Sequence, residues 1–329
     1  MQFNKLFGER YKIFAGIGVV DLSAAANGGS PFNINKLGSH FVDVFPERIT
    51  GLVYKGAGTA GDDITITVTQ PDTYDADAAT ADPLICSSIH SRPGASVAED
   101  WTLEAKNASS WTSDDNAEKS MVLAFDIPIE NVNPANGAVA ISISQAGSAG
   151  NAQFGGCLML GHLYHDNAKF VEMHQVVLGG PGDLSTAAVT RNINWSANPE
   201  DMRRLTFIGV TGVGTAGDDA EFTTGAMDSD SVDNLPFDGV YTTHGTGHNR
   251  IDYDLRHVRF PGGTASYTDD QSAENDSICA ADFLYYDIPD SIRNSAHEKN
   301  VSASLGTVTN AQLGAILAVT SGARYALES

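Results

Sequence analysis

Gly56-Ala57-Gly58-Thr59-Ala60-Gly61-Asp62-Asp63 is a stretch that this chain contains twice. It returns 156 positions later as Gly212-Val213-Gly214-Thr215-Ala216-Gly217-Asp218-Asp219, with seven of the eight residues identical. An apolar run leads into each copy, at residues 49–54 and at residues 205–210. One short match between glycine-rich segments has little meaning by itself, so the order of any further matches decides whether the chain is duplicated.

Five further pairs of segments match in the same order along the two halves of the chain. They are 21–26 with 183–188, 33–35 with 192–194, 110–118 with 266–274, 125–128 with 286–289, and 151–155 with 310–314. A period of about 160 residues is the length of a whole domain, far above the repeat unit of a solenoid. The sequence therefore predicts a tandem duplication, with one domain at residues 1–165 and a second at residues 166–329.

The pattern of apolar residues predicts β-strands. Asp63-Ile64-Thr65-Ile66-Thr67-Val68-Thr69 alternates between polar and β-branched apolar residues, which is the period of a half-buried strand. Residues 138–144 and 301–305 repeat this pattern, one in each half. Longer apolar runs, typical of strands buried on both faces, occupy residues 121–125, 155–163, 280–286 and 314–319.

A helical period does not persist for three turns anywhere in the sequence, although residues 129–132 and 290–293 are expected to form single helical turns. We interpret residues 11–26 as the first strand of the first domain rather than a signal peptide, because the matching place in the second half cannot be a signal. The fold class is therefore all-β, with about eight strands per domain in a sandwich, jelly roll or Greek-key barrel. The polar segments 70–82 and 225–234 are expected to be exposed loops.

The repeated glycine-rich stretch favours a hairpin turn. Its glycines supply positive φ, and its Asp residues are expected to bond their own backbone. A calcium site is the alternative interpretation, but two side chains fall short of the six to eight oxygens that calcium takes.

Composition narrows the class of protein. The net charge is −22, so a basic surface for phosphate is missing and direct nucleic-acid binding is not expected. The excess of acidic residues fits either a surface kept soluble in a saline environment or an acidic protein with no such adaptation. Cys86, Cys157 and Cys279 do not match between the halves, which favours buried free thiols over a disulfide framework. The apolar runs are also too short for a membrane helix.

The residues give no catalytic constellation. His162 and His165 lie three apart, which places them on opposite faces of a strand, and neither is kept in the second half. His244 and His248 also lack the partners of a cupin metal site, so solvated loop histidines are the favoured interpretation. We therefore expect no catalytic, cofactor-binding or metal-binding residues and no enzyme activity. Trp111, matched by an aromatic at position 267, is expected to belong to the core.

Two β-sandwiches of similar size in one chain, over residues 11–329, resemble the double jelly-roll major capsid proteins of tailless, membrane-containing icosahedral viruses. The resemblance implies a bacteriophage-like capsid protein that assembles as pseudo-hexameric homotrimers, is located in the virion and is assembled in the host cytoplasm. It implies as partners further copies of itself, other capsid proteins and an internal membrane. This chain departs from that family in one feature. The two rolls of the family usually show little sequence likeness, whereas the two halves of this chain align through most of their length.

Two other classes stay open at this point. A tandem β-sandwich adhesin or glycan-binding module would use its loops for recognition, and a bicupin-like enzyme would hold a metal. Fold alone does not choose among them. In the capsid interpretation, the loops within residues 70–118 and 225–274 are expected to form outward towers and much of the contact between subunits.

Overall fold

The structure, a computed structural model, is nearly all β; its described residues include the four-residue helices α1 (Phe7–Arg10) and α3 (Phe170–Met173) and one short 3-10 turn (Ile129–Asn131). It describes residues 7–23, 27–28, 32–33, 48–70, 82–94, 100–113, 119–132, 138–145, 153–162, 170–194, 204–227, 232–235, 239–244, 253–254, 266–268, 277–284 and 300–321. Within these residues, no helix has the length and apolar character needed to span a membrane.

Strands from the first half of the chain form two antiparallel sheets. Inner sheet 1 has the order β1-β12-β4-β10-β7-β8, and outer sheet 1 has the order β2-β11-β5-β6, with β3 pairing to β11 and β9 to β5. The bounds are β1 Tyr11–Asp21, β2 Asn27–Gly28, β3 Phe32–Asn33, β4 Arg48–Lys55, β5 Ile64–Gln70, β6 Asp82–Pro83, β7 Cys86–Pro93, β8 Thr102–Ala108, β9 Ser110–Thr112, β10 Met121–Pro128, β11 Ala138–Gln145 and β12 Phe154–His162.

Strands from the second half form the same two sheets again. Inner sheet 2 has the order β13-β23-β15-β21-β18-β19, and outer sheet 2 has the order β14-β22-β16-β17, with β20 pairing to β16. The bounds are β13 His174–Asp183, β14 Val189–Asn194, β15 Arg204–Thr211, β16 Glu221–Met227, β17 Val232–Asn234, β18 Gly239–His244, β19 Tyr253–Asp254, β20 Ser266–Thr268, β21 Ser277–Leu284, β22 Asn300–Leu305 and β23 Leu313–Ser321.

Each pair of sheets has the strand order of a jelly roll. Along the chain, strands alternate between the inner and the outer sheet, and early strands pair with late ones, as β1 does with β12 and β5 with β11. This interleaving is the double Greek key of a jelly roll. Both units add a hairpin at the same place, β7–β8 in the first and β18–β19 in the second, which extends the inner sheet. The tandem duplication predicted from sequence is confirmed by this repeated topology.

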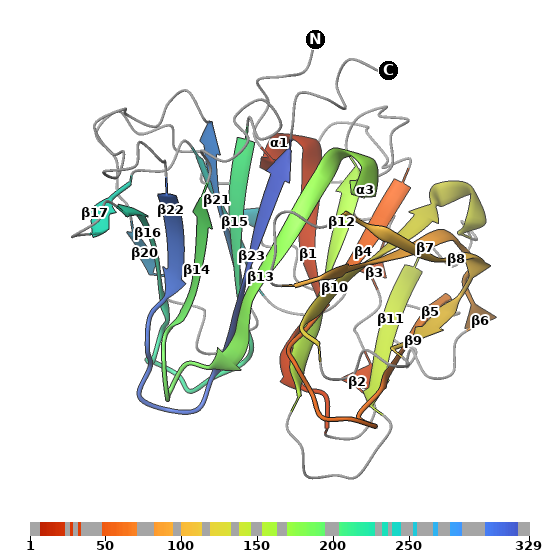
Figure 1. Ribbon diagram of the computed structural model, residues 1–329, viewed down its shortest axis with the longest axis horizontal. Coiled ribbons are helices and arrows are strands. Elements are labelled where there is room, and N and C mark those ends of the chain that lie inside the picture. Colours follow the sequence, from red (N-terminus) through yellow and green to blue (C-terminus); the bar gives the residue numbers. More distant parts are fainter. Residues whose placement is uncertain are drawn as a thin grey trace.

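Three apolar cores hold the four sheets together, and Figure 1 shows the sheets as layers side by side. One core fills each sandwich, and the third lies between the two inner sheets. The alternation of β4 illustrates this, since Val53 packs in the first sandwich while Leu52 and Tyr54 pack between the units. Strands β10, β12 and β23 of the inner sheets are buried on both faces, which confirms the interpretation of their continuous apolar runs.

The alternating strand patterns are also confirmed. Ile64, Ile66 and Val68 are fully buried, while Thr65 and Thr67 on the opposite face are half-buried. The turn after Pro128 is present as the 3-10 turn, whereas residues 290–293 and 71–81 lie outside the described residues.

Two expectations from the sequence are wrong. The stretch at residues 56–63 is not a hairpin, because β4 belongs to the inner sheet and β5 to the outer, so the stretch crosses from one sheet to the other. The segment 225–234 is not simply a loop, since its first three residues end β16 and residues 232–234 form β17. The first strand of the chain also ends at Asp21, earlier than expected.

Candidate functional site

The contact between the two units is reciprocal. Gly56 of the first unit faces the ring of Pro181 in the second, where an added Cβ would lie 3.4 Å from Cδ. Gly212, the counterpart of Gly56, faces Val19, which holds the strand position in β1 that Pro181 holds in β13. Gly56 therefore contacts Pro181, and their counterparts Gly212 and Val19 contact each other with the units exchanged. Such an exchange is the rule for an isologous contact about a two-fold axis.

The same reciprocity holds for whole elements. Strand β1 packs against β21 and β23, and its counterpart β13 packs against β10 and β12. Hydrogen bonds cross the boundary in both directions, since the Phe7 backbone N donates to Asp282 Oδ2 (2.7 Å) and the Leu178 backbone N donates to the Gly94 carbonyl (2.7 Å). The two units are thus a covalently linked pair of jelly rolls related by a local two-fold axis.

The apolar part of this contact, here called the inter-unit core, takes similar numbers of residues from each unit. Its buried members are Phe7, Tyr11, Ile13, Val19, Leu52, Tyr54, Val122, Ala124, Leu158 and Leu160 with Phe170, Val176, Leu178, Ile208, Val210, Ile278, Ala280, Ala315, Leu317 and Val319. An apolar interface of this extent resembles a domain core rather than the polar contact of domains that move against each other.

Four rings cluster about the local axis at one end of the inter-unit core. Phe7 lies 4.7 Å from Tyr11, and the counterparts Phe170 and His174 lie 4.6 Å apart. Across the boundary, Phe7 to His174 is 6.0 Å and Phe170 to Tyr11 is 5.7 Å. The Tyr11 hydroxyl and His174 Nε2 are 2.7 Å apart and share a hydrogen bond, so the counterpart residues of β1 and β13 bond to each other.

A second histidine lies beside this cluster. His162, at the end of β12, shares a hydrogen bond with Thr50 Oγ1 through Nε2 (2.8 Å) and meets the Tyr11 ring edge to face at 5.0 Å. Burial, with a smaller contribution from the charges of Arg48 and Arg10, lowers the pKa of His162 to about 3. Burial likewise holds the pKa of His174 well below its usual value, again with Arg10 nearby. Both imidazoles are therefore neutral near pH 7.

His162 is buried at the end of β12, which agrees with the buried strand expected at residues 155–163. His174 was not identified as a candidate from the sequence. It begins the segment that matches the first strand of the chain, and that position indicated an interior residue. The structure does not describe residues 163–169 or 245–252, and it describes His244 only as the last residue of β18.

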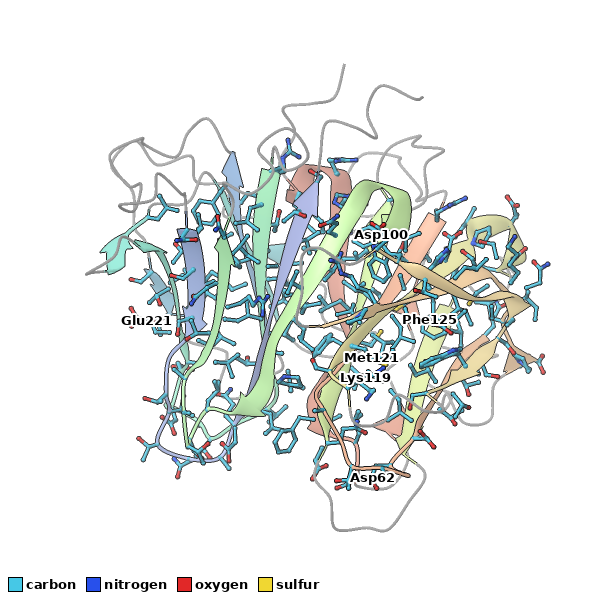
Figure 2. The ribbon with its side chains drawn as sticks, viewed as in Figure 1. Asp62, Asp100, Lys119, Met121, Phe125 and Glu221 are labelled. Atoms are coloured by element: carbon cyan, nitrogen blue, oxygen red, sulfur yellow. The ribbon has the colours of Figure 1, made fainter. Side chains whose placement is uncertain are left out.

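The two glycine-rich corners repeat the same backbone contacts. Gly56 N donates to the Phe154 carbonyl and Gly212 N to the Leu313 carbonyl, each at 2.8 Å. Positive φ occurs at Gly61 (85°) and Gly217 (79°), as the sequence predicted. The two corners lie at the end of the molecule opposite α1 and α3, and Figure 2 labels Asp62 in the first of them.

The Asp residues of the corners act differently. Asp62 accepts from Thr59 N in its own turn (3.3 Å), as expected, whereas Asp218 accepts from Thr309 N (2.8 Å) and Asn310 N (2.5 Å) in a neighbouring loop. These two backbone bonds lower the pKa of Asp218. Within the described part of the chain, no three His, Cys, Asp or Glu side chains gather as a metal site would need.

Other predicted residues fall inside the sandwiches. Cys86, Cys157 and Cys279 are buried free thiols, as predicted, and burial raises the pKa of Cys86 to about 12. Trp111 and Tyr267 pack against the cores of their own units, which confirms the interpretation of this aromatic match.

Comparisons with known proteins leave the chain without an assigned family. No protein-family profile matches it, and no curated protein is similar to it in sequence. Among solved structures, a protein of Parabacteroides distasonis assigned as secreted shows 9% identity and a TM-score of 0.21, over 95% of this chain and 87% of the other.

Two viral structures are similar at the same low level. A chain of Sulfolobus Turreted Icosahedral Virus shows 11% identity and a TM-score of 0.19, with 95% of this chain and 60% of the viral chain covered. The major capsid protein P2 of bacteriophage PM2 shows 9% identity and a TM-score of 0.18, over 94% and 97% of the two chains. Similarities this low establish no relationship, and the jelly-roll assignment rests on the strand order of this chain alone.

Proposed function

We propose that this protein is a shell-forming structural subunit, a viral major capsid protein that works as an assembly of its own copies. The observation that carries the proposal is the reciprocal inter-unit core, which joins two jelly rolls into one four-layered block. Jelly rolls serve as capsid and lectin domains and as cupin enzymes. A chain in which two rolls form one block suits the role of a structural subunit.

The interiors of the rolls support the structural role over the cupin-like one. A cupin holds its metal between the sheets of its barrel. In both units of this chain, that space is occupied by packed apolar side chains such as Ile66 and Phe125 in the first and Phe207 and Phe222 in the second, all at most 1% exposed. The buried polar groups of the inter-unit core lie outside the rolls and bond to one another.

The proposal includes a homotrimer, with other capsid proteins and an internal membrane as further partners in the virion. A ring of six equivalent rolls would repeat one head-to-tail contact, whereas the contact inside this chain is reciprocal. Three chains around a three-fold axis would therefore alternate two kinds of contact, one within chains and one between them.

Sedimentation velocity and electron microscopy of the purified protein test the proposal. We expect trimers or closed shells at micromolar concentration, well above the 34.7 kDa of one chain. Because the chain carries −22, we also expect assembly to strengthen as salt rises, since about 0.1 M salt screens charges over roughly 10 Å. A stable monomer at every ionic strength, with or without divalent cations, would contradict the proposal and favour the glycan-binding adhesin.

A further inference from the structure

We propose that the outward face of outer sheet 1 is a self-association surface that binds the same face of a second copy of this chain. This surface, here called the hydroxyl face, consists of the half-buried Thr65 and Thr67 on β5 with the exposed Ser110 and Thr112 on β9. The inference rests on the proposed function and specifies a surface that joins one trimer to another, because a contact between identical faces is two-fold and cannot lie within a three-fold trimer.

Strand alternation creates the hydroxyl face. Ile64, Ile66 and Val68 point into the first sandwich, so the threonines between them point away from it. The register places Thr65 opposite Thr112 and Thr67 opposite Ser110 on the neighbouring strand. The hydroxyl groups of Thr65 and Thr112 are 3.0 Å apart, and the side chains of Ser110 and Thr112 are exposed. Rows of hydroxyl groups thus run across the sheet.

The hydroxyl face differs in charge from the acidic chain as a whole. The chain carries −22, and copies that approach through charged surfaces must bring like charges together, which disfavours the wrong pairings. Among the described strands of outer sheet 1, the one charged residue is Asp82, whose partner in the register is Gln70. Gln70 belongs to the inward-pointing set of β5, so Asp82 does not share a face with the threonines. As far as the described strands show, the hydroxyl face is therefore an uncharged sheet face on an acidic chain.

The second unit shows what the same surface looks like with a charge. Glu221 pairs with Thr268, as Thr65 pairs with Thr112, so Glu221 stands at the position of Thr65. Its side chain is exposed and lies on the outer flank of the second unit, as labelled in Figure 2. Two copies meeting through outer sheet 2 would bring two such carboxylates together, whereas the hydroxyl face would not.

Hydroxyl groups also suit a surface that meets its own copy. Each hydroxyl donates one hydrogen bond and accepts others, whereas an ionised carboxylate only accepts. A two-fold contact presents identical groups to each other, so groups that both donate and accept can pair without a different partner. The inner sheets already bind each other through sheet faces within the chain, which leaves the outer faces for contacts between chains. These observations favour a second copy as the occupant.

Thr65→Glu tests the proposal with little risk to the fold, because the second unit holds Glu221 at the same position. We expect the variant to raise the dissociation constant for self-association about tenfold or more, since two new carboxylates meet across the two-fold contact. The matched control is Thr190→Glu on the exposed face of outer sheet 2, which is expected to change the constant less than about twofold. Sedimentation velocity at fixed salt measures both, and the melting temperature confirms that each variant folds.

Cross-linking gives a second measurement that does not depend on weakening the contact. The three natural cysteines are buried, so Thr112→Cys would place one accessible thiol on the hydroxyl face. A short bismaleimide is expected to link Thr112→Cys chains into dimers, and to link much less of a Thr102→Cys control on exposed β8.

The outcomes separate this inference from the proposed function. If the wild type assembles but Thr65→Glu assembles equally well, or if Thr112→Cys forms no more dimer than the control, the hydroxyl face is wrong and the shell-forming role stands. If the wild type does not self-associate at any salt concentration, both proposals are wrong.

Discussion

The two units share a backbone frame but differ where they meet the rest of the molecule. Ser23 and Ser185 bond to Asp21 and Asp183 in the same way, with their backbone N atoms 2.9 Å from the carboxylate in each unit. By contrast, His162 occupies the place of Ser321, since each is the register partner of the first residue of the first strand in its unit, Tyr11 or His174. The Asp-Ser turn at the end of the first strand has stayed the same, whereas His162 and Ser321 have diverged beside the local axis, although Phe7 and Phe170 there are identical.

The pair on the axis shows why divergence there is useful. In a symmetric homodimer, counterpart residues at the axis are identical, so a tyrosine would meet a tyrosine. In this chain the counterparts are Tyr11 and His174, which form a hydroxyl–imidazole hydrogen bond. Duplication within one chain therefore allows complementary partners at a two-fold contact. The same freedom applies on the outside, where Thr65 and Glu221 make the two outer sheets different surfaces.

The largest expected effect comes from charging one sandwich core. Ile66→Asp places a carboxylate among fully buried apolar side chains, which costs several kcal/mol, so we expect loss of soluble folded protein. Thr65→Asp, one residue away on the other face, is expected to fold normally. Circular dichroism and thermal unfolding compare the two variants, and equal behaviour would show that the sheet faces are assigned wrongly.

Acid is expected to weaken the inter-unit core next. Both His162 and His174 have folded pKa values below the unfolded value of 6.5, so the unfolded chain binds more protons as pH falls. Stability should therefore be fully present above pH 6.5 and decrease below it, down to the folded pKa of about 3 for His162. Each buried histidine contributes a slope of up to about 1.4 kcal/mol per pH unit in this window.

Urea unfolding between pH 7.5 and pH 4 measures this effect. His162→Ser introduces the residue found at the matching position of the second unit, and this variant should show a shallower pH dependence than the wild type. An unchanged slope would indicate that His162 does not titrate on unfolding.

Part of the fold could be predicted from the sequence, and part could not. Internal matches and period-two patterns predicted the duplication, the all-β class and the buried strand faces, because each depends on local side-chain alternation. The connection at residues 56–63 was taken for a hairpin because glycine and aspartate favour any sharp turn, whether the chain returns to the same sheet or crosses to another. The position of His162 beside Phe170 of the second unit could not be predicted, because no local pattern encodes how the two units are placed.

Glycine substitutions at the two corners should split the symmetry of the contact. A Cβ at Gly212 would lie 2.3 Å from the Val19 carbonyl oxygen, so Gly212→Ala must displace backbone across the boundary. We expect a loss of about 1–3 kcal/mol, the usual cost of overpacking. At Gly56 the atom nearest to an added Cβ is the Pro181 Cδ, at 3.4 Å, which is ordinary van der Waals contact. Gly56→Ala is therefore expected to change the free energy of unfolding by at most about 1 kcal/mol. Equal effects in urea unfolding would contradict the difference in space around the two glycines.

The smallest effect is expected at the aspartates of the corners, where the two units use the same residue differently. Asp218→Ala removes the acceptor of the Thr309 and Asn310 backbone N–H groups, so we expect these two amides to exchange hydrogen faster. Because Asp218 is partly exposed, the melting temperature should change little. Asp62→Ala acts on its own turn through Thr59 and should leave the matching loop of the first unit unaffected. Hydrogen exchange resolved by residue distinguishes the two, and unchanged protection at Thr309 and Asn310 in Asp218→Ala would show that the aspartate does not hold that loop.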